Sequence, residues 1–309
     1  MNHPRGYVVL ILALVLVLSG VTPAIATDRR MDLTTSTDAV PSAGGGRVAL
    51  LIGNSDYEHA ALPNPVNDVR AFATTLKDIG WDVIQRENCD ILAMEEAAKE
   101  FNDRLRKCDI GLFYYSGHGC QIDGENFLVP LKANLSKPLE IRHKCFPAKL
   151  LVDYMEDAGS KLNIIILDAC RDNPFKGSSR SLSSGLAKMD LAPGRQMLLA
   201  YATDPGNVAQ DGDPGSNSPF MKHMLKNIRT PGLDINKLFR EVRKGVRSET
   251  GEKQRPWETS CLMDDFFFVP PDAVAPAVGP QATTGLATGT VPPAASDSTT
   301  AVSAAAPTM

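Results

Sequence analysis

Five short apolar runs, separated by stretches of helical pattern, constrain the fold of this chain most. They lie at 47–54, 81–84, 108–115, 162–168 and 196–202. Short runs of aliphatic and aromatic residues, stopped by glycine or by polar residues, are typical of buried strands. Strands that alternate with helices need right-handed crossovers and therefore build a mainly parallel sheet. The predicted fold class is α/β, a doubly wound, mainly parallel sheet with helices on both faces.

Four helices and one hairpin are expected between or after these runs. Asn64 followed by Pro65 is typical of an N-cap with proline at the first helical position, and it predicts a helix to about Ile79. The apolar face of this helix would consist of Val69, Phe72, Leu76 and Ile79. Further helices are expected at 94–106, 219–228 and 234–248, and a hairpin with an Asp-Gly turn at 121–131.

Both ends of the chain differ in composition from its middle. Residues 1–26 combine Arg5, an apolar stretch and Ala24-Ile25-Ala26, the pattern of a secretory signal peptide, although an uncleaved anchor is an alternative. Residues 27–46 are small and polar and predict a flexible linker. Residues 270–309 are rich in Pro, Ala and Thr and predict a disordered tail. We therefore expect one folded domain at 47–269 in an exported protein, periplasmic or secreted.

The charge balance bears on possible partners. The formal net charge is −4, and the sequence contains no run of basic residues. Nucleic-acid-binding proteins carry clustered positive charge, so no nucleic-acid partner is expected. No stable membrane association is expected if the signal peptide is cleaved. The oligomeric state stays open.

A histidine and a cysteine each follow an apolar run. His118 lies in Tyr-Tyr-Ser-Gly-His-Gly, and Cys170 lies in Asp-Ala-Cys-Arg after Ile164–Leu167. Either residue alone would more often pack in a core. In this order, with a separation of about 50 residues, they match the histidine and cysteine spacing of caspase-type nucleophile pairs. Neighbouring parallel strands would bring them to one edge of the sheet, where a thiolate and an imidazole can act together.

These two segments resemble those of caspase-like cysteine peptidases, the bacterial relatives of metacaspases and caspases. Support comes from the segments at 62–68, 201–203 and 217–220, and the resemblance covers about 47–269. It implies a caspase-like sheet in which Cys170 attacks a peptide carbonyl while His118 protonates the leaving amine and later activates water. It also implies that the N–H groups of Gly119 and Cys170 bind the oxyanion. Glycine would let the backbone approach that oxygen closely. Protein or peptide substrates are therefore expected.

The resemblance also bears on specificity. Asp168, Asp68 and Ser116 match the acidic and polar pocket positions of metacaspases, which predicts cleavage after Arg, with Lys second. Alternatively, Asp68 would complement a helix dipole and Asp168 would bind backbone groups. The chain departs from the family at Pro65, where many metacaspases have cysteine, and at Asp172, where caspases have glycine.

Two long polar segments, 173–195 and 203–218, follow the strands around Cys170. Loops of this length in a domain are usually functional or disordered, and we expect them to form the walls of a substrate cleft. Arg180, Lys188 and Arg195 lie where caspases are cut into two subunits. Self-cleavage at these residues is therefore a hypothesis.

Three other functions are alternatives to the peptidase. A non-proteolytic interaction module would keep the fold but would be free to lose His118 and Cys170. A metal site of His118, Cys120 and Cys170 lacks the paired ligand spacing of structural zinc sites, so no metal is predicted. A nucleotide site is not favoured because Gly44–Gly46 precedes the first strand. No cofactor is implied, and calcium dependence stays open. Six cysteines are present, and if Cys170 remains a thiol, at least one other cannot pair within the chain.

Overall fold

The structure, a computed structural model, describes residues 45–170, 186–189, 196–204, 207 and 209–271. All of them belong to one structural unit, residues 39–309. The predicted signal peptide, almost all of the predicted linker and the tail from 272 onward lie outside the described residues. Within the described residues, none of the helices has the length and apolar character needed to span a bilayer.

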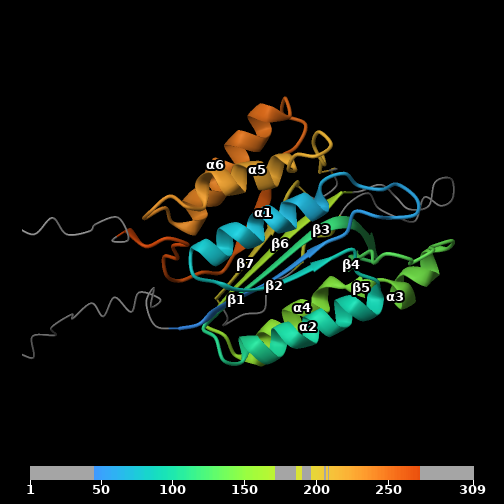
Figure 1. Cartoon of the computed structure of the whole chain (residues 1–309), viewed down its shortest axis with the longest axis horizontal. Helices are drawn as coiled ribbons and strands as arrows, with labels where there is room; N and C mark the ends of the chain where they lie inside the picture. The colour runs from blue at the N-terminus through green and yellow to red at the C-terminus, as the bar shows by residue number, and fades with distance from the viewer. Residues whose placement is uncertain (1–44, 171–185, 190–195, 205–206, 208, 272–309) are drawn as a thin grey trace, which may run out of the picture. The chain divides into compact units, whose positions relative to one another are not determined.

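The main sheet has the strand order β2-β1-β3-β6-β7-β8 (Figure 1). Its members are β1 (Arg47–Gly53), β2 (Asp82–Glu87), β3 (Ile110–Ile122), β6 (Leu162–Cys170), β7 (Gln196–Tyr201) and β8 (Trp257–Ser260). The first five run parallel, and β8 pairs antiparallel with β7 at the edge. The five predicted strands and their mainly parallel arrangement are confirmed.

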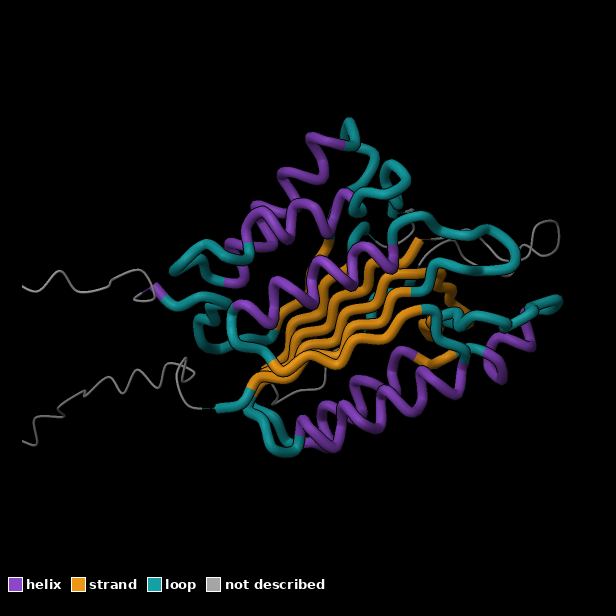
Figure 2. The backbone as a smooth tube through the Cα atoms, in the orientation of Figure 1, coloured by secondary structure: helices purple, strands orange, loops and turns teal. Residues whose placement is uncertain are grey.

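Helices cover both faces of this sheet, as Figure 2 shows in purple around the orange strands. One face packs against α1 (Pro65–Asp78), α5 (Pro219–Asn227) and α6 (Ile235–Glu249), and the other against α2 (Ile91–Leu105) and α4 (Ala148–Ala158). Alternate strand residues enter the two cores: Leu51 lies in the first and Leu50 in the second. Side chains of a strand alternate between faces, which explains why the buried strands are apolar along their whole length.

A small antiparallel sheet extends from the carboxyl end of β3. Residues Gly119–Ile122 of β3 pair with β4 (Glu125–Leu128), which pairs with β5 (Phe146–Pro147). Asp123 and Gly124 form the turn with φ angles of 51° and 80°, the positive values that a tight hairpin turn needs. The predicted hairpin is confirmed. A short 3₁₀ helix (Pro138–Glu140) and α3 (Ile141–Lys144) lead into β5.

Candidate functional site

His118 and Cys170 are register partners on the two central strands. β3 and β6 pair in parallel from Ile110 opposite Leu162 as far as His118 opposite Cys170. Two residues earlier in each strand, Ser116 lies opposite Asp168. β3 does not end near His118, as the apolar run predicted, but continues to Ile122 because β4 takes over as its partner where β6 ends. His118 therefore lies at the junction of two sheets, beside the last residue of β6.

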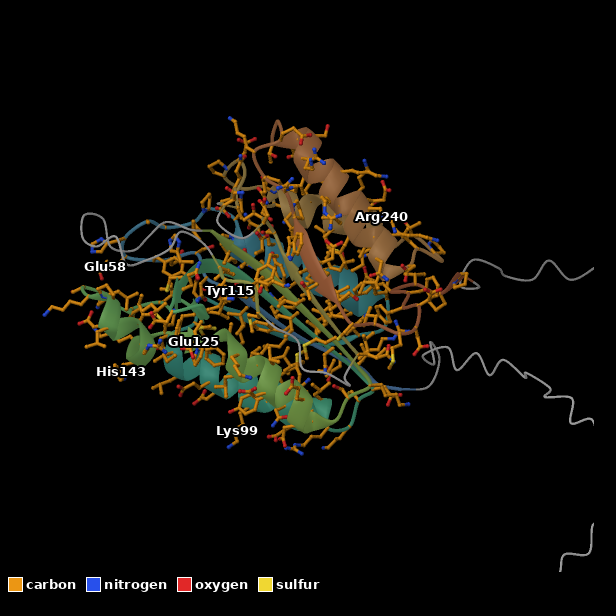
Figure 3. All side chains as sticks on the ribbon, turned by 180° about the vertical axis from the view of Figure 1, so that it is seen from behind. Glu58, Lys99, Tyr115, Glu125, His143 and Arg240 are labelled. Atoms are coloured by element: carbon orange, nitrogen blue, oxygen red, sulfur yellow. The ribbon has the colours of Figure 1, made fainter. Side chains whose placement is uncertain are left out.

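Two buried tyrosines hold the backbone of His118. Its N–H donates to Tyr57 Oη at 3.0 Å, and its carbonyl accepts from Tyr115 Oη at 2.8 Å. A Cβ on Gly117 would lie 2.7 Å from both tyrosine hydroxyls, so only glycine allows the strand to pass this closely. Tyr115 is fully buried and lies between the two helix layers in Figure 3. Hydrogen bonds to two tyrosine hydroxyls thus fix the backbone on both sides of the His118 Cα atom.

The ring of His118 is held by a second set of contacts. Nε2 lies 2.6 Å from the carbonyl oxygen of Ala60. A carbonyl can only accept, so Nε2 carries hydrogen and Nδ1 is the basic nitrogen of the neutral imidazole. Ala60 has a φ of 60°, an uncommon value for a residue other than glycine. The Tyr57 ring lies against the imidazole, with centroids 4.4 Å apart. These contacts set both the tautomer and the orientation of His118.

Three predicted pocket residues meet around one tyrosine hydroxyl. Tyr114 Oη lies 3.5 Å from Asp68 Oδ2 and 3.3 Å from Asp168 Oδ2, and it also bonds the side chain of Ser116. Asp68 comes from the first turn of α1, whereas the other three residues come from β3 and β6. Asp68, Ser116 and Asp168 are exposed by only 0%, 2% and 1%. The structure brings the predicted pocket residues together, but buries them.

The start of α5 covers these carboxyls. Asp68 Oδ1 accepts from Asn217 Nδ2 at 2.9 Å and from the Ser218 N–H at 3.0 Å. Ser218 Oγ donates to Asp168 Oδ2 at 2.7 Å and accepts from the Met221 N–H at 3.0 Å, which caps the helix. Asp68 lies in the first turn of α1, where the helix-dipole alternative places it, whereas the hydrogen bonds described for the Asp168 carboxyl are to the side chains of Tyr114 and Ser218 and not to backbone groups.

Burial and mutual repulsion perturb the titration of the two acids. Burial raises the pKa of Asp68 to about 7, against the effect of its three hydrogen bonds. Burial, followed by repulsion from Asp68, raises the pKa of Asp168 well above its ordinary value. The main causes of both shifts include no lysine or arginine of the described residues. Within those residues the cluster is acidic, and a bound cation would relieve the repulsion between its carboxylates.

The sequence did not identify a third acid, Asp211. Burial raises the pKa of Asp211 to about 6, and its charge raises the pKa values of Asp68 and Asp168. It lies in the 203–218 segment, whose Gly, Asp and Asn composition gave no signal that distinguished one aspartate from its neighbours. Asp211 differs from its neighbour Asp213 in the folded structure, where Asp211 is partly buried and Asp213 is exposed.

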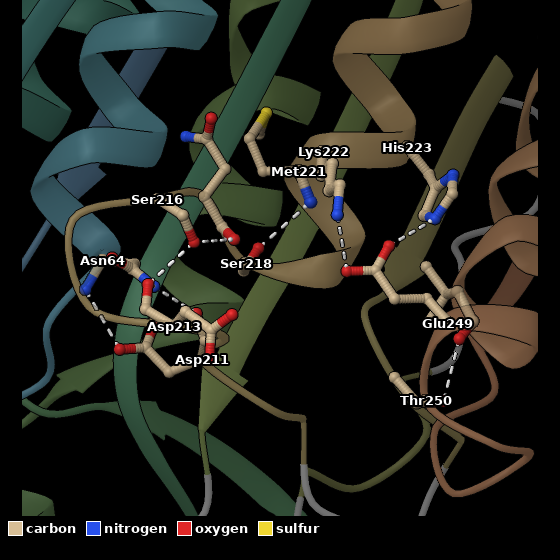
Figure 4. Close-up of polar contacts among 12 residues, drawn as sticks. Asn64, Asp211, Asp213, Ser216, Ser218, Met221, Lys222, His223, Glu249 and Thr250 are labelled. Atoms are coloured by element: carbon tan, nitrogen blue, oxygen red, sulfur yellow. Dashed lines mark hydrogen bonds and ion pairs between the residues drawn. The ribbon is translucent and has the colours of Figure 1, made fainter.

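Asn64 anchors this acidic segment to α1 (Figure 4). Asn64 Nδ2 donates to the carbonyls of Asp211 at 2.6 Å and Asp213 at 2.8 Å, and the Asn64 N–H donates to Asp211 Oδ2 at 3.0 Å. The predicted N-cap position of Asn64 is correct, but its side chain does not cap α1. It binds the other loop instead, which places Asp211 near the start of α1.

Gly119 is the first residue of β3 that pairs with β4, directly after the pairing of β3 with β6 ends at His118. A Cβ at this position would be 2.9 Å from the Cβ of Ala169 and 3.1 Å from Leu186 Cδ2. Only glycine therefore lets β3 approach the residue next to Cys170 this closely. The predicted role of the Gly119 N–H as an oxyanion donor stays a prediction.

Parts of the two long loops are described. From 173–195, residues 186–189 are described, and Asn126 clamps them: its Nδ2 donates to the Ala187 carbonyl at 2.7 Å, and its Oδ1 accepts the Ala187 N–H at 2.6 Å. Lys188 is exposed, whereas Arg180 and Arg195 lie outside the described residues. Within the described ranges, no group of three or more His, Cys, Asp and Glu side chains is arranged to hold a metal ion.

The chain is similar to several proteins of one family. The family model of the caspase domain matches residues 46–268. The human mucosa-associated lymphoid tissue lymphoma translocation protein 1 is 35% identical over 201 residues, which are 63% of this chain and 23% of that protein. Rat caspase-1 is 22% identical over 73% of this chain and 60% of its own length. The match thus spans less than a quarter of the human relative.

The fold gives the same result. The solved structure of caspase-1 from Spodoptera frugiperda matches with a TM-score of 0.50 and 18% identity, over 73% of this chain and 92% of that one. The match of the family model over most of the chain agrees with the sheet order described above. The chain belongs to the caspase-domain family of cysteine peptidases.

Proposed function

We propose that this protein is a cysteine endopeptidase with a dyad of Cys170 and His118. The observation that carries the proposal is the pairing of these two residues across the central strands, at the edge where open α/β sheets have their sites. The Cys170 thiolate attacks the scissile carbonyl, and the C–N bond breaks as His118 Nδ1 delivers a proton to the leaving amine. Water, deprotonated by His118, then hydrolyses the thioester and releases Cys170.

The contacts of His118 support this role. The Ala60 carbonyl binds the Nε2 hydrogen and so leaves Nδ1 as the nitrogen that exchanges a proton. The same carbonyl stabilises the imidazolium that forms when Cys170 is ionised. The N–H groups of Gly119 and Cys170 bind the oxyanion in this proposal, and such donors contribute about two to three orders of magnitude in kcat.

The acidic cluster supports cleavage after a basic residue. Burial raises the proton affinity of Asp68, Asp168 and Asp211, and the charge of Asp211 adds to this effect at the other two acids. A guanidinium or ammonium ion would let them ionise. Arginine is favoured over lysine because its planar guanidinium has several N–H donors that can bond more than one carboxylate at the same time. Ser116 supplies a neutral hydrogen-bonding group beside them through Tyr114.

Access to this pocket requires movement of the segment at 211–218. Asp68 and Asp168 are fully covered, and Asn217 and Ser218 bind them directly. A substrate side chain would replace the hydrogen bonds that Asn217 and Ser218 now donate. The proposal therefore includes displacement of these two residues when a basic side chain binds.

Hydrolysis of fluorogenic peptides ending in Arg, Lys or Asp tests the proposal. We expect the full-length protein to cleave after Arg best and after Lys second, and we expect Cys170→Ala and His118→Ala to lose at least about a thousandfold in kcat/KM. Cys89→Ser is the matched control, since Cys89 is buried beside α2 and outside the site. Cleavage after Asp alone would contradict the pocket assignment, and no cleavage of any peptide would favour a non-proteolytic module.

The export and self-cleavage of the chain are further proposals. Sequencing the N-terminus of the protein recovered outside the cytosol tests the predicted removal of residues 1–26. Incubation of active protein with Cys170→Ala as substrate tests cleavage at Arg180, Lys188 or Arg195. An N-terminus that still begins at Met1, or a chain that stays intact, would contradict the respective proposal.

A further inference from the structure

A pair of cysteine thiols lies behind His118, within the small sheet. Cys120 follows His118 by two residues and pairs with Phe127 of β4, while Cys145 directly precedes β5, the strand on the other side of β4. The two cysteines belong to one buried apolar cluster, whose other buried members are Tyr57, Phe127, Val129 and Ile141. A residue of β3 and the residue just before β5 thus meet in the same cluster.

The two thiols lie close enough to interact. Cys120 is exposed by 8% and Cys145 by 3%, and hydrogen bonding with the Cys120 side chain is the largest cause of the raised pKa of Cys145. Both also lie close enough to the Tyr115 hydroxyl to affect its titration. The other cysteines with described side chains lie elsewhere: Cys89 and Cys108 against the α2 face, and the exposed Cys261 next to the Met197 carbonyl. Cys120 and Cys145 are therefore positioned to react with each other rather than with these residues.

We propose that Cys120 and Cys145 form a disulfide that braces the small sheet behind His118. The oxidant is another disulfide, either that of a thiol–disulfide exchange protein or a small-molecule disulfide. One cysteine thiolate attacks it and forms a mixed disulfide; the second thiolate then attacks the first cysteine's sulfur. In total, two S–H bonds break and one S–S bond forms, while the oxidant gains two electrons and two protons and becomes two thiols. This inference does not depend on the proposed peptidase activity.

The bond would affect both stability and the reactive site. It closes the loop between residues 120 and 145, which contains β4, the short 3₁₀ helix and α3, and it restricts the unfolded chain. It also occupies Cys120, which lies two residues after His118, the strand partner of Cys170. A paired Cys120 cannot form a disulfide with Cys170.

Burial determines when the bond forms. The pKa of Cys145 is raised by hydrogen bonding with the Cys120 thiol and by burial, so little Cys145 thiolate is present in the folded protein. Exchange requires a thiolate and access to the oxidant, and the closed cluster limits both. The disulfide therefore forms while the domain folds, and it resists reductants once the domain is closed.

Peptide mapping tests the pair in full-length protein carrying Cys170→Ala, which removes the reactive thiol. The reduced, unfolded protein is refolded with oxidised and reduced glutathione, denatured with iodoacetamide and digested without reductant. We expect a peptide that joins Cys120 to Cys145, while Cys89, Cys108 and Cys261 are alkylated. Alkylation of both Cys120 and Cys145, or a bond from either one to another cysteine, overturns the proposal. The same map on protein isolated from an oxidising compartment gives the result without refolding.

Thermal melting tests the bracing role. The oxidised Cys170→Ala protein should melt at a lower temperature with dithiothreitol than without it, by a difference on the order of 5 °C or more. The triple variant C120S/C145S/C170A should melt at the same temperature with and without reductant. C89S/C170A is the matched control and should keep the full effect of dithiothreitol. A Cys170→Ala protein whose melting temperature does not change on reduction would overturn the bracing role.

Discussion

Tyr57 and His118 are joined twice: the tyrosine hydroxyl accepts the histidine N–H at 3.0 Å, and the two rings lie 4.4 Å apart. The same hydroxyl donates to the Val129 carbonyl at 2.9 Å, so it links β3 to the residue after β4. Tyr57 does not need to touch a substrate to influence the reaction. We interpret it as a positioning residue of His118.

Tyr57→Phe keeps the ring and removes the hydroxyl. We expect kcat to fall about tenfold with little change in KM, because a buried N–H and a buried carbonyl each lose a partner and the imidazole is held less firmly. Steady-state kinetics with an Arg peptide, together with the pH profile of kcat, measure the effect. A Tyr57→Phe variant with an altered KM and an unchanged kcat would contradict the positioning role.

Asp211→Asn is expected to raise KM for Arg peptides several-fold, by an amount on the order of 1 kcal/mol in binding. The substitution removes one charge from the acidic cluster, and the pKa of Asp68 should fall because Asp211 raises it. Asp213→Asn is the matched control, since Asp213 is exposed in the same segment. Equal KM changes in both variants would show a general charge effect instead of a pocket contact.

Stability should fall as the pH rises from about 4 to about 7. The folded-state pKa of Asp68 is about 7, above the ordinary value of 3.8, so the folded state retains a proton that the unfolded chain has lost in this range. Stability decreases with pH wherever the folded state binds more protons. Asp168 acts in the same direction.

Asp68→Asn removes this titration and should flatten the pH dependence of the melting temperature above pH 5. Thermal unfolding of both proteins across this range measures the difference. Glu87→Gln is a useful control because the pKa of Glu87 is lowered by Arg70, so its contribution to stability is lost toward acid pH instead. A wild-type protein that gains stability from pH 5 to 7 would refute the assignment.

Gly119→Ala should reduce both activity and stability, the latter by about 1–3 kcal/mol, because its Cβ would overlap that of Ala169. The double variant Gly119→Ala/Ala169→Gly removes the overlapping atom and should recover most of the stability. Chemical denaturation and peptide hydrolysis measure the two effects separately. If the double variant were no more stable than Gly119→Ala, the close approach would not be the cause.

Asn126→Ala should expose the segment around Lys188 to proteolysis. Its side chain holds Ala187 by two hydrogen bonds, and a protease needs an extended, detached segment. Limited trypsin digestion of the inactive Cys170→Ala protein, with and without Asn126→Ala, measures cleavage after Lys188. Asn102→Ala, on α2, serves as a control away from this segment.

The sequence predicted the apolar strands and helices because burial on both faces leaves a strong hydrophobic signal. It did not predict β8, a short polar strand whose pairing depends on the exposed edge of β7. It also did not predict α4, although Ala148, Leu151, Val152 and Met155 recur at helical spacing. The sequence also predicted that His118 and Cys170 lie on neighbouring parallel strands, and the two residues are register partners on β3 and β6.

Side-chain partners between distant segments were harder to predict. Asn64 has the sequence signature of a helix cap, but its amide bonds the loop at 211–215. Asp211 is one of several acids in a loop of low complexity, and only its burial distinguishes it. Such contacts form between segments far apart in the chain, so the local sequence around each residue does not predict them.

Ser218 joins Asp68 and Asp168 by hydrogen bonds, and His118 lies opposite Cys170, so the candidate site needs four widely spaced segments of the chain. A chain still being synthesised, or threaded unfolded through a translocation channel, contains the cysteine and the histidine but not their geometry. In the proposed function, cleavage after a basic residue would therefore wait until the chain beyond Ser218 has emerged and packed. The late position of α5 in the sequence would then delay assembly of the acidic cluster without a separate inhibitor.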